Sequence, residues 1–160
     1  MRHKLNILLA AQLLMLPALA VQAATCSLGS NDLGFGAVLP GKMADGSAAV
    51  FVACNSTAPP ETVNYSVTIS AGNGSSYSPR RMSLIGGGST PVNYNLFTDS
   101  SRSQVWGDGT AGTNVVAGSL MVVSASSSAN ATLPVYGRIF ASQQSEAGDY
   151  GDLLVITLNF

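Results

Sequence analysis

Histidine is almost absent from this sequence of 160 residues, and cysteine is scarce. The single histidine, His3, lies in an N-terminal segment that reads as a cleavable leader, so the rest of the chain has none. This absence excludes Ser-His-Asp and Cys-His catalytic groups and every histidine-ligated metal site. We therefore expect neither an enzyme nor a bound cofactor.

Charged residues are also few, at 9% of the chain. Residues 24–160 hold five basic side chains against eight acidic ones, a net charge of −3, and the basic residues form no run. A chain without a basic stripe is a poor partner for nucleic acid or for an anionic membrane surface. The acidic residues mostly stand beside Gly or Ser, which is typical of turns, and no spacing pairs two of them for glycoside hydrolysis.

The N-terminal residues have the pattern of a secretory signal peptide. Basic residues at positions 2–4 precede an apolar run from Leu5 to Ala20, and Ala23 supplies the small residue that a signal peptidase reads. The run is shorter than the ~20 residues that span a bilayer, and no second apolar run follows it. We expect cleavage after Ala23, no later membrane insertion, and one exported domain over residues 24–160.

Two cysteines, Cys26 and Cys54, remain in the exported domain. An even number of cysteines in an exported chain predicts a disulfide. Closing a loop of about 28 residues should stabilise the fold by roughly 3 kcal/mol, chiefly by restricting the unfolded chain. A reactive thiol pair is the weaker interpretation, because the close C-x-x-C spacing and a neighbouring base are both lacking.

What the chain does contain is period-two alternation. Val63, Tyr65, Val67 and Ile69 alternate with polar residues, the pattern of a half-buried strand, and similar short runs recur between clusters of turn residues. No window shows a convincing helical repeat. The pattern predicts an all-β fold, an antiparallel, immunoglobulin-like β-sandwich.

The last strand reads DLLVITLNF and is the most apolar of the set. Its one face carries Leu154, Ile156, Leu158 and Phe160. At the edge of a sheet such a strand invites aggregation unless something covers it. A central position in the sheet explains the periodicity equally well, so both interpretations stay open at this point.

The only tryptophan, Trp106, lies in the stretch YNLFTDSSRSQVWGDGT. With Tyr94 and Phe97 it could form a platform for stacking a sugar, but a Trp beside a tight Gly-Asp-Gly turn is better explained as a plug at the end of the sandwich. Asp108 and Asp149 lie in segments that offer oxygen ligands, but their spacing does not match a calcium loop.

Several stretches in this order resemble the spore coat protein U domain family, which includes the pilin subunits of archaic chaperone–usher pili in Gram-negative bacteria. The stretches are Cys26, Leu33–Gly36, Val52–Cys54, Arg81-Met82, Tyr94–Asp99, Val105–Thr110, Val135–Ile139 and Gly148–Asp152.

The resemblance implies an immunoglobulin-like sandwich that lacks one strand. A periplasmic chaperone fills the gap first, and a neighbouring subunit's N-terminal extension fills it in the pilus, both by strand addition. On this view the last strand faces the groove and the chaperone through Leu154, Ile156, Leu158 and Phe160.

The resemblance also implies that the motif around Trp106 and the motifs around Tyr136 and Tyr150 are structural. We expect Arg138 and Asp152 to meet across strands. The full set of structural positions is Trp106, Gly107, Asp108, Gly109, Tyr136, Gly137, Arg138, Tyr150 and Asp152.

One departure from the family pattern concerns the strand that a subunit donates. Only Ala24 and Thr25 separate the predicted cleavage site from Cys26. We therefore expect a subunit that accepts a strand without giving one, a tip or minor subunit of an adhesive pilus. The expected partners are the chaperone, the usher, a neighbouring subunit and a surface or glycan receptor, and the expected location is the cell surface after passage through the periplasm. The alternative is a self-contained secreted coat or carbohydrate-binding protein.

Overall fold

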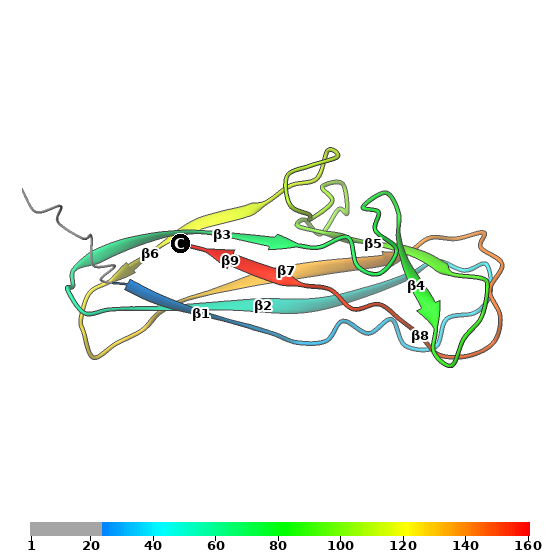
Figure 1. The fold of residues 1–160 in the computed structure, drawn as a ribbon, viewed down its shortest axis with the longest axis horizontal. Helices are drawn as coiled ribbons and strands as arrows, with labels where there is room; N and C mark the ends of the chain where they lie inside the picture. The colour runs from blue at the N-terminus through cyan, green and yellow to red at the C-terminus, as the bar shows by residue number, and fades with distance from the viewer. Residues whose placement is uncertain (1–23) are drawn as a thin grey trace, which may run out of the picture.

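The computed structural model describes residues 24–160, and the predicted signal peptide, residues 1–23, lies outside the described residues. All the regular elements in the described range are β-strands, arranged as two antiparallel sheets that face each other (Figure 1). This confirms the predicted all-β sandwich. The strands are β1 (Ala24–Ser30), β2 (Ala44–Ser56), β3 (Glu61–Ile69), β4 (Arg80–Leu84), β5 (Val92–Phe97), β6 (Val116–Val122), β7 (Ala129–Ile139), β8 (Tyr150–Gly151) and β9 (Ile156–Asn159).

The two sheets differ in size. The larger has the strand order β1-β2-β7-β5-β4-β8, and the smaller has the order β6-β3-β9. The long strands β2 and β7 form the middle of the larger sheet, paired from Ala44 opposite Ile139 to Cys54 opposite Ala129. The smaller sheet lies over one half of the larger one, while β4 and β8 lie toward its other end (Figure 1).

The core lies where the two sheets overlap. Val63, Tyr65, Val67 and Ile69 of β3 are all buried, as the alternation predicts, and the inner face of β2 is buried opposite them. The alternate residues of β3 are exposed or half-buried. Period-two burial on one face only is what a two-layer sandwich requires, because each sheet has one wet and one dry face.

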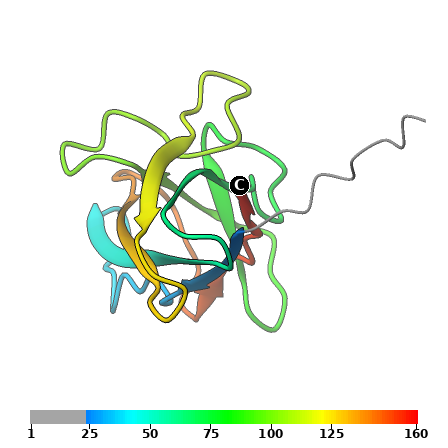
Figure 2. The same cartoon turned by 90° about the vertical axis from the view of Figure 1, so that its left-hand side faces the viewer.

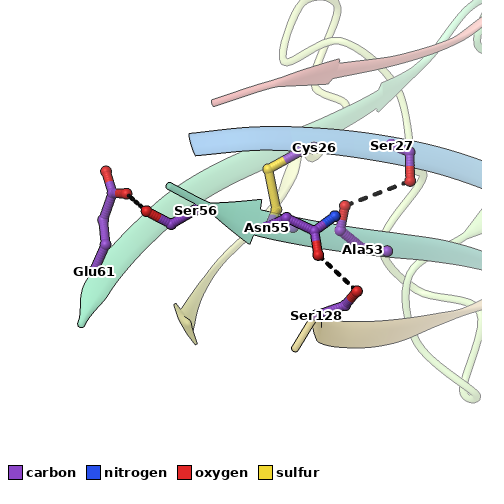
Figure 3. The surroundings of a disulfide bond; sticks show 8 residues. Cys26, Ser27, Ala53, Asn55, Ser56, Glu61 and Ser128 are labelled. Carbon is purple, nitrogen blue, oxygen red and sulfur yellow. Dashed lines mark hydrogen bonds between the residues drawn. A yellow bond between two sulfur atoms is a disulfide. The ribbon is translucent and has the colours of Figure 1, made fainter. Parts of the chain in front are cut away.

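A disulfide joins the first two strands. Cys26 and Cys54 are directly opposite each other in β1 and β2, with an S–S distance of 2.05 Å, so the predicted disulfide is confirmed (Figure 3). Nearby, the Ser128 hydroxyl donates to Asn55 Oδ1 at 2.7 Å and ties β2 to the start of β7. The edge strand β1 is therefore fixed covalently to the body of the sheet.

A pair of glycines explains how the stretch Leu33–Gly36 packs against the strand that contains Val135–Ile139. Gly46 of β2 and Gly137 of β7 are opposite each other, and Leu33 and Phe35 of the following loop lie on this bare patch. A Cβ at Gly46 would stand 2.7 Å from the carbonyl oxygen of Gly34, and one at Gly137 would stand 2.8 Å from Leu33 Cδ2. The absence of side chains on these two strands therefore lets the loop after β1 pack against the inner face of the sheet.

This packing gives a direct test. Gly46→Ala should lower the free energy of unfolding by about 1–3 kcal/mol, because the new methyl group meets the backbone of Gly34. The matched control is Gly29→Ala in β1, where a Cβ would meet nothing within 4 Å and the expected change is below about 0.5 kcal/mol. Urea denaturation followed by tryptophan fluorescence measures both. Equal stabilities of the two variants would show that the loop does not need the bare patch.

Candidate strand-binding groove

Trp106 is fully buried, at 0% exposure, and its indole Nε1–H donates to the carbonyl oxygen of Val67 at 3.0 Å. Neither face of the ring is available for a sugar. The loop after Trp106 is packed so closely that only glycine fits at position 107, because a Cβ there would stand 2.3 Å from Thr113 Oγ1. The Thr113 hydroxyl donates to the carbonyl oxygen of Thr110, which closes the loop that carries the tryptophan.

Sequence reasoning missed Arg80, the most deeply buried charge in the described chain. It is 0% exposed, and burial lowers the pKa of its guanidinium. Its four acceptors come from three separate segments: the carbonyl oxygens of Ile69 (3.4 Å), Ser70 (2.9 Å) and Trp106 (2.6 Å), and Asn95 Oδ1 (2.7 Å). The resemblance pointed instead to its neighbour Arg81, which is exposed. No local signal in the sequence distinguishes the two arginines.

Asp152 fastens the chain just before the last strand. Its Oδ2 accepts a hydrogen bond from the Tyr94 hydroxyl at 2.7 Å, and its Oδ1 accepts one from the Asn73 backbone N–H at 2.8 Å. Burial and the hydrogen bond to Asp152 raise the pKa of Tyr94. Gly72 has a φ of +75° and no room for a Cβ, which would lie 2.1 Å from Asp152 Oδ2. The turn at Gly72 and the carboxylate thus fit together closely.

The predicted contact between Arg138 and Asp152 is wrong. Arg138 forms a two-pronged ion pair with Asp45 instead, with its Nε 2.8 Å and its Nη2 2.9 Å from the two carboxylate oxygens. The reason is register, because Asp45 of β2 is directly opposite Arg138 of β7. Asp152 follows β8, which lies at the far edge of the same sheet.

The last strand, β9, lies at the edge of the smaller sheet and pairs only with β3. Leu154, Ile156 and Leu158 are half-buried against the core, whereas Phe160 is 44% exposed. The two apolar residues on the opposite face, Leu153 and Val155, are 76% and 64% exposed. Of the two positions that the periodicity left open, the structure has the edge position.

Hydrogen bonding between β3 and β9 fixes which main-chain groups of β9 are unpaired. The Ser70 N–H donates to the Val155 carbonyl oxygen at 2.9 Å, so this pair is hydrogen-bonded and the pattern alternates from it along the strand. Thr157 and Asn159 therefore bond to β3. Ile156 and Leu158 direct their N–H and C=O groups to the free edge, and the same two residues direct their side chains inward.

The free edge of β1 has the same design. The Asn31 N–H donates to the Ala49 carbonyl oxygen at 3.0 Å, which places the alternate residues Gly29 and Ser27 in bonds to β2. Cys26 and Leu28 then direct their main-chain groups away from β2. The Cα–Cα distance of 4.1 Å across the disulfide agrees, since pairs without hydrogen bonds stand about 4.5 Å apart.

The edges of β1 and β9 lie on the same side of the molecule and run in opposite directions (Figures 1 and 2). Beyond the end of β1 the space between the sheets widens into a cavity of about 810 Å³. Inner-face residues such as Val50, Leu96 and Val135 form its floor, and residues 30–42 and 145–154 form its walls. We refer to the two free edges and this cavity together as the open groove.

The sequence profile of the Spore Coat Protein U domain matches residues 12–157. The chain belongs to this family. No curated protein matches it. Within this chain, Trp106 is buried and its indole N–H bonds to the core strand β3.

Solved structures that are similar to the chain include two chaperone–adhesin complexes. One is the CsuC–CsuE chaperone–tip adhesion subunit pre-assembly complex from the archaic chaperone–usher Csu pili of Acinetobacter baumannii, with a TM-score of 0.51 and 19% identity over 86% of this chain. The other is a chaperone–tip adhesin complex of CFA/I fimbriae, with a TM-score of 0.44 and 16% identity over 80% of this chain. This chain spans about two fifths of the matched chains, 40% and 38% respectively. The first likeness supports the immunoglobulin-like fold.

Within residues 24–160, no group of three or more His, Cys, Asp or Glu side chains is placed to hold a metal ion. In the same range, no helix has the length and hydropathy needed to cross a bilayer.

The buried arginine gives the second test. Arg80→Met should lower the free energy of unfolding by about 3 kcal/mol or more, because it removes the donor to the carbonyl oxygens of Ile69, Ser70 and Trp106. Arg81→Met, the same substitution at the exposed neighbour, should change it by less than about 0.5 kcal/mol. Chemical denaturation of the two variants measures the difference. An Arg80→Met protein as stable as the wild type would show that the guanidinium does not hold these segments together.

Proposed function

We propose that this chain is a structural, non-enzymatic subunit of a chaperone–usher surface pilus, completed by a strand from another polypeptide. The observation that carries the proposal is the open groove, in which two free sheet edges border a cavity with an apolar floor. Membership of the Spore Coat Protein U domain family and the fold shared with a chaperone–adhesin complex support it. The chaperone, the usher and a neighbouring subunit are the partners that the proposal requires, and export to the cell surface is the route.

The last strand has the features that strand addition needs. Ile156 and Leu158 present unpaired main-chain groups at the edge and apolar side chains beneath it, so an added strand bonds to the edge while its own side chains enter the groove. Leu154 lines the cavity at one end, and Phe160 lies at the other end of the strand. These four residues are the proposed contact surface for the chaperone.

We also propose a tip or minor position in the fibre. If cleavage follows Ala23, two residues remain before Cys26, and Cys26 of β1 is bound to Cys54 of β2. Such an N-terminus cannot reach into a neighbour. Edman sequencing of the secreted protein checks this, and an N-terminus well before Ala23 would argue for a subunit inside the fibre. The self-contained sugar-binding alternative loses its main candidate residue, because Trp106 is buried.

Co-expression with the periplasmic chaperone of its own pilus system tests the groove. We expect a one-to-one complex, and Leu158→Ser should weaken it about tenfold or more, because an apolar groove contact is lost. Thr157→Ser, a change of the adjacent outward-facing residue, should leave the affinity unchanged. Size exclusion and isothermal titration measure complex formation. A stable monomer that unfolds cooperatively and does not bind the chaperone would contradict strand addition.

Amide hydrogen exchange gives a second test at the level of single residues. In the chain without a partner, the amides of Cys26, Leu28, Ile156 and Leu158 should exchange rapidly, whereas those of Ser27 and Thr157 should be protected. Adding the donor strand should protect the first set as well. NMR-detected exchange before and after complex formation measures this alternation. Uniform protection of both sets in the free chain would show that the edges are already paired.

A further inference from the structure

The carboxylates of the described chain are unevenly distributed around the open groove. Four of the eight acidic residues line the cavity, but only one of the five basic residues, Lys42, does so. The four are Asp32, Glu146, Asp149 and Asp152.

Most of this negative charge has no cation beside it. In residues 24–160 the ion pairs are those of Asp45 with Arg102 and Arg138, on another face of the molecule. Asp152 is already bonded to Tyr94 and to the Asn73 N–H. Asp32, Glu146 and Asp149 are exposed at the mouth of the cavity, where Glu146 accepts one hydrogen bond from the Thr90 hydroxyl at 3.2 Å.

The three carboxylates lie at a defined end of the groove. Asp32 lies two residues after the end of β1, and Glu146 and Asp149 precede β8 and the segment that leads to β9. This end is opposite the end of the molecule where β9 finishes (Figure 1). A strand that lies between β1 and β9 therefore has one terminus beside an apolar cavity with an acidic mouth.

We infer that the strand that fills the open groove is an extended segment of a partner protein with alternating apolar residues and with basic side chains at the end next to Ser30 and Leu154. The free main-chain groups of Cys26, Leu28, Ile156 and Leu158 demand an extended backbone, and the apolar floor demands alternating apolar side chains. The unpaired carboxylates select lysine or arginine at that end, since opposite charges at a rim steer association and reject like-charged partners. This inference rests on the proposed function and adds the charge of the partner to it.

Synthetic donor peptides test the inference with the exported chain. Each peptide has an alternating Val/Thr body, with Lys-Gly-Lys, Gln-Gly-Gln or Glu-Gly-Glu at one end, and each is made in two series with the charged group at the N- or C-terminal end. Fluorescence anisotropy measures the Kd in 50 mM and 500 mM NaCl. In one series the lysine peptide should bind about tenfold more tightly than the glutamate peptide at low salt. At high salt, the difference in Kd between these two peptides should fall below about twofold. The series that shows the effect gives the direction of the added strand.

Variants of the chain assign the effect to the acidic mouth. A triple variant, Asp32→Asn with Glu146→Gln and Asp149→Asn, should bind all three peptides with the affinity of the glutamine peptide. The matched control is Glu61→Gln at the start of β3, away from the cavity, where the amide oxygen can still accept the bond from Ser56 that the carboxylate accepts now. The control should keep the full discrimination, and thermal melting should show that both variants fold.

The outcomes separate the inference from the proposed function. If the three peptides bind equally well at low salt, or if the triple variant still discriminates between them, the charge inference is overturned and strand addition stands. If no peptide binds, including the glutamine one, and the edge amides do not become protected, strand addition itself is overturned. A dimer of the chain that the peptides do not dissociate would make a second copy the occupant and would likewise overturn the inference.

Discussion

The main-chain hydrogen bonds of an antiparallel sheet alternate in direction, and the function proposed for this chain depends on that constraint. In β9, Ile156 and Leu158 direct their side chains into the core and their N–H and C=O groups to the free edge of the sheet. When a strand is added, these groups replace their hydrogen bonds to water with hydrogen bonds to the strand, at a net gain of about 0.5–1.5 kcal/mol per bond. Filling the apolar cavity contributes about 25 cal/mol for each Å² of apolar surface removed from water. The edge groups therefore require an extended partner backbone, and the burial of apolar side chains in the cavity adds to the affinity.

Both edges of the groove are held in place before a strand arrives. The disulfide fixes β1, and Asp152 fixes the chain that leads into β9 through Tyr94 and the turn at Gly72. Arg80 donates to the carbonyl oxygens of Ile69, the last residue of β3, and of Ser70, which pairs with Val155. A preorganised groove loses little conformational entropy on binding, so more of the interaction energy remains as affinity.

Local pattern in the sequence accounts for much of this architecture. Alternation identifies the buried face of β3 and the two faces of the last strand, and export together with an even cysteine count identifies the disulfide. Arg80 escapes such reasoning because its acceptors come from segments 10 to 26 residues away and no neighbour of Arg80 in sequence reveals them. The pairing of Arg138 with Asp45 and the bare patch at Gly46 depend on the register between β2 and β7, which periodicity does not specify.

A pilus subunit with an open groove, as proposed for this chain, must avoid filling the grooves of its own copies. The outward face of the last strand is polar at Thr157 and Asn159, whereas Leu153 and Val155 before them are exposed and apolar. In the scheme inferred above, the acidic mouth of the cavity also disfavours association of two copies. Two copies that approach groove to groove bring like charges together, whereas a donor strand with a basic end is attracted to the same carboxylates. One set of side chains, Asp32, Glu146 and Asp149, then serves both to reject a second copy and to select the partner.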